Sequence, residues 1–223
     1  MATYNDSKPE LTIAPQQLPK IANPAPLGLA GFGLTTILLS CVNAGLIPAT
    51  GANAVVPLAF AFGGLAQIIA GILEYVNGNT FGMVAFTSFG TFWWWYAFMV
   101  WTVGAGWIKA PAPVAVAVTL GLWGVFTLYM WVSTFRANKG VWTVFLLLWI
   151  TFFLLSAGDF GVAGAKVLGG YIGILTGAAA MYVSFAEVTN GAFGYNLIPL
   201  GAPLVKERPP RMPGGTGTGV RAA

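Results

Sequence analysis

Six long apolar runs separated by short polar stretches dominate the sequence. Each is about as long as a helix needs to cross a bilayer, roughly 17 to 25 residues. The fifth run is the weakest, because Gly158, Asp159 and Gly161 follow it closely. The runs cover approximately residues 28–47, 54–76, 83–107, 114–135, 141–157 and 168–188. This pattern predicts an all-α membrane protein with six transmembrane helices.

The composition points the same way. Hydrophobic residues make up 57% of the 223 positions and charged residues 7%, whereas about 25% charged is ordinary for a soluble domain. We expect three segments: a polar tail over 1–22, a six-helix transmembrane domain over 23–200, and a disordered basic tail over 201–223. The apolar segment starts too late for a signal peptide.

The positions of Lys and Arg predict the orientation. If the amino terminus is cytoplasmic, eight of the ten basic residues lie on that side, and only Lys109 and Lys166 lie outside. An excess of positive charge marks the cytoplasmic side. We therefore expect a multi-pass protein of the inner or plasma membrane with both termini in the cytoplasm.

Several function classes are disfavoured by the residues. Cys41 is the single cysteine and histidine is absent, so neither a disulfide framework nor the commonest metal sites can form within the chain. No nucleophile, metal cluster or phosphate-cradling loop stands out, and basic residues form no patch interleaved with aromatic residues. We expect no enzyme, no cofactor, no metal and no nucleic-acid partner.

An internal repeat links the second and sixth runs. Gly64, Gln67, Gly71 and Glu74 fall on one helical face, and the same steps recur 113 residues later. The later copy is Gly177, Ala180, Ser184 and Glu187, and a fainter one in the fourth run contains Gly124, Thr127 and Thr134. We interpret this as three parallel helix hairpins around a central pore.

Five blocks of sequence, in order, resemble one family. Residues 23–32 read Asn-Pro-Ala-Pro-Leu-Gly-Leu-Ala-Gly-Phe, and further matches cover 64–75, 78–82, 85–88 and 121–127. They resemble the acetate uptake transporters, the succinate-acetate permeases of bacteria, archaea and yeasts. The resemblance implies transport of acetate, with succinate and other short carboxylates as further substrates. It also implies a homohexamer with one pathway in each protomer.

The resemblance implies an apolar constriction formed by Phe32, Phe89 and Leu148. Counted from the cytoplasmic start of each run, these residues lie at similar depth. Phe89 departs from the family pattern, which has Tyr, so we expect a drier constriction. A charged carboxylate pays a large desolvation cost in such a neck, and the protonated acid pays far less. The protein would then act as an anion channel or as a proton symporter.

Polar and small residues complete the predicted pathway. The predicted polar lining is Asn23, Thr36, Asn43, Gln67, Thr87 and Ser88. Pro24 and Gly28 would shape the cytoplasmic entrance. Glu74 and Glu187 would lie at the mouth, either as interfacial carboxylates that hold it together or as proton carriers. A single Ser or Thr can equally serve helix packing. A channel for neutral solutes such as urea, ammonia or short amides is the alternative function.

Overall fold

The computed structural model describes residues 22–205, and the terminal segments that we expect to be tails lie mostly outside this range. Within 22–205 every regular element is helical. The elements in chain order are α1 (Ala25–Asn43), η1 (Ala49–Gly51), α2 (Ala52–Leu58), η2 (Ala59–Ala66), α3 (Gln67–Val76), α4 (Thr80–Gly104), α5 (Pro113–Ser133), η3 (Thr134–Arg136), α6 (Lys139–Asp159) and α7 (Ala165–Phe193). The predicted all-α fold is confirmed.

The second span is one helix with an irregular centre. Its 28 residues from Ala49 to Val76 are long and apolar enough to cross a membrane. The stretch η2 has π-helical hydrogen bonding and follows Pro57, which has no N–H to donate. Such wider turns are rare and often occur at functional positions.

Five helical spans in residues 22–205 combine sufficient length with high mean hydropathy, and α4 is the sixth long helix. Its 25 residues would suffice, but consecutive Trp93, Trp94 and Trp95 lower its mean hydropathy. The fifth span, predicted to be the weakest, is an uninterrupted helix of 21 residues.

The amino-terminal boundary of α1 differs from our expectation. We predicted a start at Leu27 or Gly28, because residues before proline avoid the helical region. The helix begins at Ala25 instead, with Pro24 as its N-cap residue. The first turn of a helix tolerates proline, since its N–H groups have no intrahelical partner there.

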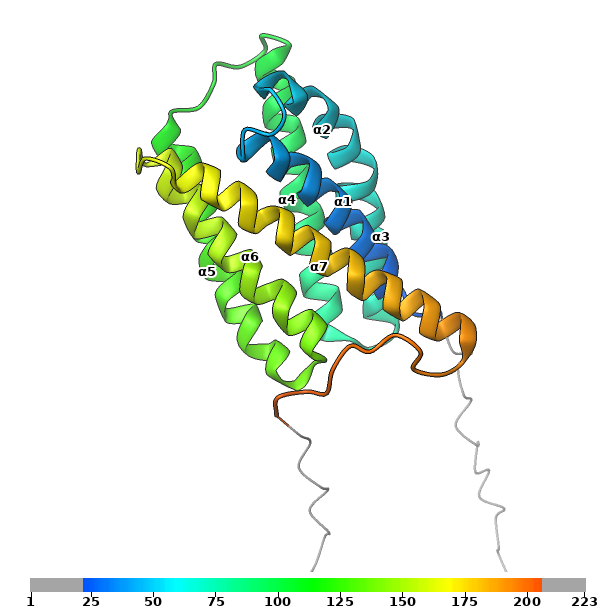
Figure 1. The fold of residues 1–223 in the computed structure, drawn as a ribbon. Helices are drawn as coiled ribbons and strands as arrows, with labels where there is room; N and C mark the ends of the chain where they lie inside the picture. Colours follow the sequence, from blue (N-terminus) through cyan, green and yellow to red (C-terminus); the bar gives the residue numbers. More distant parts are fainter. Residues whose placement is uncertain (1–21, 206–223) are drawn as a thin grey trace, which may run out of the picture.

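The contacts between the six spans close into a ring, and Figure 1 shows the helices packed into one bundle. Going round the ring, α1 packs on α7, α7 on α6 and α6 on α5, while α3 packs on α4 and returns to α1. The pair α4 and α5, which the hairpin interpretation joins, make the fewest contacts in the ring. By contrast, α7 packs closely on both α1 and α6, as does α5 on α6 and α3 on α4.

Glycines allow a close crossing of α1 and α7. A Cβ added to Gly33 of α1 would lie 2.9 Å from the carbonyl oxygen of Gly177, and one added to Gly177 would lie 2.7 Å from that of Gly33. The backbones of α1 and α7 thus touch where the sequence repeat places its small residues. This matches the role of small residues at membrane helix interfaces.

The described chain begins and ends at the same end of the bundle, the lower end in Figure 1. After α7 the chain crosses this end to reach α6 and α5. Gly140 N donates to Leu200 O at 3.0 Å, and Val205 N donates to Phe135 O at 2.9 Å. These bonds hold residues 200–205, which include the described part of the predicted C-terminal tail.

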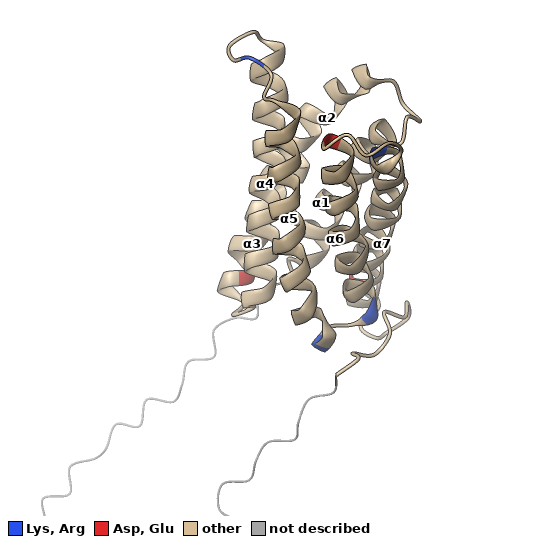
Figure 2. Cartoon of the chain, turned by 90° about the vertical axis from the view of Figure 1, so that its left-hand side faces the viewer, with Lys and Arg blue, Asp and Glu red and all other residues tan. Residues whose placement is uncertain are grey.

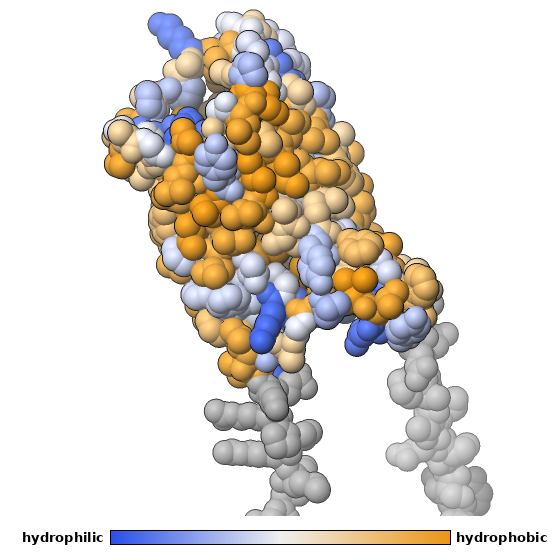
Figure 3. Space-filling view, viewed as in Figure 1, coloured by the Kyte–Doolittle hydropathy of each residue, from blue (hydrophilic) through white to orange (hydrophobic). Residues whose placement is uncertain are grey.

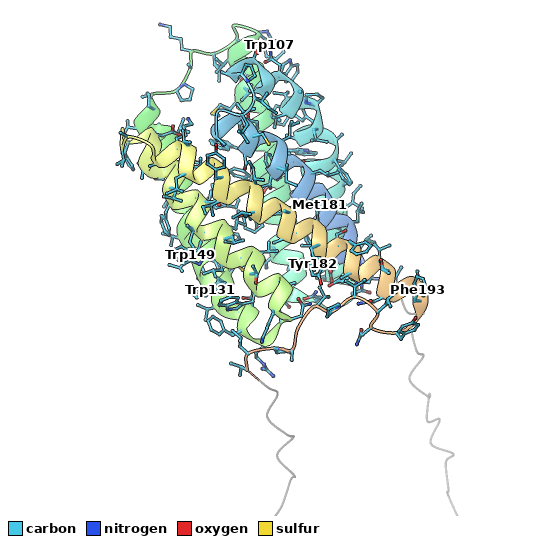
Figure 4. All side chains as sticks on the ribbon, viewed as in Figure 1. Trp107, Trp131, Trp149, Met181, Tyr182 and Phe193 are labelled. Carbon is cyan, nitrogen blue, oxygen red and sulfur yellow. The ribbon has the colours of Figure 1, made fainter. Side chains whose placement is uncertain are left out.

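Charge and hydropathy divide the surface into three zones. Charged residues of the described chain colour the two ends of the bundle and leave its middle bare (Figure 2). Hydrophobic side chains dominate the middle of the face shown in Figure 3. Aromatic residues join helices as well: Trp131 of α5 and Trp149 of α6 lie with ring centroids 6.0 Å apart (Figure 4).

Candidate functional site

Two cavities lie between the helices, one toward each end of the bundle. The lower cavity has a volume of about 340 Å³ and is lined from α1, α3, α4, α5, α6 and α7. The upper cavity has a volume of about 410 Å³ and is lined mainly from α1, α4, α5 and α6. Five helices contribute to both: α1, α4, α5, α6 and α7. The two cavities therefore lie one above the other within the same ring of helices.

The three residues of the predicted constriction line the lower cavity together. Phe32, Phe89 and Leu148 are 5%, 3% and 4% exposed. The rings of Phe32 and Phe89 have centroids 5.8 Å apart and are tilted by 55°. Three different helices thus bring apolar groups to the same cavity.

An aromatic layer backs this wall toward the upper cavity. Phe89 stacks on Phe152 with centroids 6.4 Å apart, and Phe92 meets Phe152 edge to face at 5.3 Å. Trp123 of α5 contacts both Phe89 and Phe92. Phe92 also lines the upper cavity. The separation between the two cavities is therefore apolar and aromatic.

Our sequence reasoning missed these backing residues. A signal was present, because Phe92 follows Phe89 by one helical turn and Phe152 follows Leu148 by one turn. The sequence alone did not show that α5 would bring Trp123 into the same layer.

Polar residues occur on both sides of the apolar layer. Gln67 lines the lower cavity, is 1% exposed, and has no hydrogen-bond partner for Oε1 among the described residues. Asn43 lines the upper cavity. Thr36, which we predicted to line the pathway, lies on α1 between Phe32 and Asn43 and lines neither of the two cavities, and its buried Oγ1 lacks a partner within the described chain. A buried polar atom without a protein partner is available to a solute or water.

Thr87 and Ser88 lie elsewhere. The structure brings neither to the wall of the two cavities described above. Thr87 lies against Gly71, where a Cβ would come within 2.7 Å of the Thr87 backbone nitrogen. Ser184, a member of the repeat, donates to Pro26 O at 2.7 Å and so joins α7 to the start of α1. Thr87 and Ser184 therefore contribute to helix packing.

The lower mouth contains the same hydrogen-bond arrangement twice. Asn79 Nδ2 donates to Glu74 Oε2 at 2.9 Å, while Asn79 Oδ1 accepts from Gly82 N at the start of α4. Asn23 Nδ2 donates to Glu187 Oε2 at 2.9 Å, while Asn23 Oδ1 accepts from Ala25 N at the start of α1. Each asparagine thus ties a helix start to a carboxylate on a neighbouring helix.

The other residues predicted to shape the entrance lie in the first turn of α1. Pro24 O accepts from Leu27 N and Gly28 N at 3.1 and 3.3 Å. Gly28 is buried, and a Cβ there would overlap the ring of Phe86. Gly28 therefore sets the distance between α1 and α4 below the constriction.

The upper cavity ends in an ion pair. Lys166 Nζ donates to Asp159 Oδ1 at 2.7 Å, and both residues line the cavity together with Tyr96. The Lys166 side chain is 52% exposed and that of Asp159 is 15% exposed. The pair joins the end of α6 to the start of α7.

Comparison with known proteins gives consistent matches. Residues 5–202 match the model of the GPR1/FUN34/yaaH family. The succinate-acetate/proton symporter SatP of Escherichia coli K12 is 44% identical over 183 residues, which are 82% of this chain and 96% of that protein. Acetate permease A of Emericella nidulans is 37% identical over 199 residues, which are 81% of this chain and 66% of that protein.

A solved structure agrees with the fold. The structure of the bacterial acetate channel SatP matches with a TM-score of 0.78 at 44% identity. The match covers 82% of this chain and 100% of that one. The likeness therefore extends over the whole ring of six helices.

Proposed function

This chain belongs to the GPR1/FUN34/yaaH family, and from that premise we propose that it transports acetate across a cell membrane. The observation that carries the proposal is a pair of cavities within one ring of helices, separated by an apolar layer. Polar groups lie on both sides of this layer, with Gln67 below and Asn43 above. A small carboxylate can be held at either side and can cross the layer between them.

The apolar layer sets the form in which the solute crosses. A bare carboxylate loses its hydration among Phe32, Phe89 and Leu148, and few protein groups replace it there. The protonated acid costs far less to desolvate, and its methyl group fits an apolar wall. We therefore propose that acetate crosses the constriction as the neutral acid or together with a proton. Succinate and other short carboxylates are further candidate substrates.

The topology and assembly are also proposals. We place the lower end in the cytoplasm, because most of the basic residues belong to that side. We propose an inner or plasma membrane location and a homohexamer with one pathway in each protomer, as the family resemblance implies. The particle mass in detergent tests the assembly, and a mass of six chains is the expected result.

The constriction is tested by enlarging one of its side chains. Leu148→Phe adds a ring to the neck, and we expect protein-dependent uptake of labelled acetate by proteoliposomes to fall about tenfold. That fall corresponds to roughly 1.4 kcal/mol on the barrier. Leu122→Phe is the matched control, since Leu122 is 65% exposed on the outer face of α5. Equal uptake by the two variants would contradict the assignment of Leu148.

The alternative of a neutral-solute channel is tested in the same vesicles. An acetate pathway should be blocked by other short monocarboxylates and not by urea. Block by urea, with protein-dependent urea flux, would favour the alternative. Protein-free vesicles give the background, because acetic acid also crosses lipid unaided.

A further inference from the structure

The two carboxylates at the lower mouth belong to a pattern with three members. Asn138 caps α6 by accepting from Val141 N at 2.9 Å, as Asn79 caps α4. Glu74 lies five residues before Asn79, and Ser133 lies five residues before Asn138. Ser133 also lines the lower cavity. Glu74 and Glu187 therefore supply two carboxylates at the mouth, whereas the stretch from Ser133 to Asn138 contains none.

Glu74 occupies a site that is shaped for its carboxyl group. The residue is 2% exposed, and Oε1 has no hydrogen-bond partner in the described part of the chain. Gly82 leaves the space that the group fills, since a Cβ there would lie 2.8 Å from Glu74 Cδ. The start of α4 and Asn79 favour a charged carboxylate, whereas burial with one free oxygen disfavours it. Because one effect favours the charged carboxylate and the other favours the neutral acid, Glu74 is suited to gain and lose a proton.

Glu187 faces the same cavity as Glu74, and both residues line it together with Arg136. With both carboxylates ionised, these three residues carry a net charge of minus one. An entering carboxylate anion adds another negative charge, and this favours protonation of one glutamate. Binding of the anion and of a proton then promote each other.

A further polar group in the cavity suits the neutral acid. Gln67 is almost fully buried, and its Oε1 is free to accept the O–H of a protonated carboxylic acid. Gln67 and Glu74 lie two turns apart on the same face of α3, which leads from the constriction to the mouth. The cavity thus offers an acceptor for the acid and, further along, a base for its proton.

We propose that Glu74 and Glu187 hold the proton that accompanies the carboxylate through the lower cavity. A neutral acid arriving from the constriction transfers its proton to one of these carboxylates, which leaves the substrate as an anion and the glutamate as a neutral acid. The glutamate then releases the proton to water at the mouth. Transport in the other direction reverses both steps. This inference rests on the proposed function and names groups for its proton.

A purely structural role predicts a different behaviour. If each glutamate only ties a helix start to its neighbour, a glutamine would keep that role, because its amide oxygen still accepts from asparagine. Stability would then change little, and so would the charge carried with each acetate. The net charge moved per transported acetate separates the two roles, since a neutral amide cannot hold a proton.

The experiment measures labelled acetate uptake and electrical current in proteoliposomes that contain the full chain. Unaided diffusion of acetic acid through lipid carries no charge, so it adds nothing to the current. Wild-type protein should take up acetate without current, because a proton moves with each anion. The double variant Glu74→Gln, Glu187→Gln should move one negative charge with each acetate. A potential of 100 mV should then change its equilibrium accumulation about 50-fold.

A control variant replaces a carboxylate that the proposal does not use. Glu207→Gln changes a residue outside the described range, and it should behave as wild type. Wild-type current in proportion to uptake would overturn the proposal, as would a double variant that transports acetate without current. If the double variant takes up no acetate, a second measurement tests the proposal. Acetate is added to the wild-type protein and to the double variant in detergent, and the protons that each protein takes up are measured. Loss of that proton uptake in the variant supports the proposal, and its persistence overturns it.

Failure of the proposed function looks different. In that case the wild-type protein would give neither protein-dependent acetate uptake nor acetate-dependent current. The premise of the inference would then be removed as well. The three results of coupled transport, uncoupled transport and no transport are therefore distinct in the same vesicles.

Discussion

The rings of Phe32 and Phe89 meet at the wall of the lower cavity with centroids 5.8 Å apart, although they come from helices that are not joined in a hairpin. Phe89 also contacts Phe126, Phe145 and Phe152. One residue of α4 therefore links α1, α5 and α6 at the level of the constriction. Substitutions at Phe89 should therefore change the rate of transport more than they change the packing of any single pair of helices.

Phe89→Tyr introduces a hydroxyl into this apolar wall. The solute then keeps one hydrogen bond at the level where Phe32 and Leu148 offer none. We expect acetate uptake to rise roughly fivefold, which corresponds to about 1 kcal/mol, the usual net value of such a bond. Phe185→Tyr on the exposed face of α7 is the control and should have no effect. Slower uptake would mean that the hydroxyl is buried among the rings without a partner.

Gln67→Leu should change the stability of the protein and its acetate uptake in opposite directions. The Oε1 of Gln67 is buried without a protein partner, and such a group costs about 1 to 3 kcal/mol of stability. Replacing the carboxamide by an apolar side chain of similar size should therefore raise the melting temperature in detergent. Acetate uptake should fall roughly tenfold, because the lower cavity loses a polar contact for the solute.

The control for Gln67 is Thr127→Val. Thr127 Oγ1 already bonds Trp123 O in its own helix at 2.7 Å, so both uptake and stability should change little. A Gln67→Leu protein that is less stable and transports normally would assign Gln67 to helix packing.

Much of this architecture was predictable because a bilayer makes strict demands on sequence. Six long helices follow from the six apolar runs, and the repeated small and polar residues did mark buried faces, as Gly177 and Gln67 show. The common depth of Phe32, Phe89 and Leu148 could be counted from the starts of their spans. These features depend on the position of a residue along one helix, which a sequence pattern contains.

Other features depend on which helices are neighbours, and these were not predictable. Asn23 and Glu187 are 164 positions apart, and their bond exists because α7 packs on α1 to close the ring. Trp123 belongs to the aromatic layer only because α5 lies beside α4 and α6.

Gly33→Ala tests the close crossing of α1 and α7. The added Cβ would lie 2.9 Å from Gly177 O, and backbone cannot move aside as a side chain can. We expect a loss of roughly 1 to 3 kcal/mol in stability from this overpacking, even though alanine favours a helix by about 1 kcal/mol over glycine. Gly191→Ala is the control, since nothing lies within 4 Å of its added Cβ. The control should be as stable as wild type or more so, and equal loss in both would exclude the crossing as the cause.

Asp159→Asn and Lys166→Gln should shift acetate entry from the upper side in opposite directions. With Asp159 neutral, Lys166 attracts anions to the upper cavity, so the initial rate should rise a few-fold at about 0.01 M salt, where charges act over roughly 30 Å. Without Lys166, the remaining carboxylate repels them and the rate should fall. Both effects should vanish near 1 M salt, where the range is about 3 Å. Because Lys166 is half exposed, neither change should alter stability by more than about 1 kcal/mol. If both variants change the initial rate in the same direction, or if the rates do not depend on salt concentration, the ion pair only joins α6 to α7.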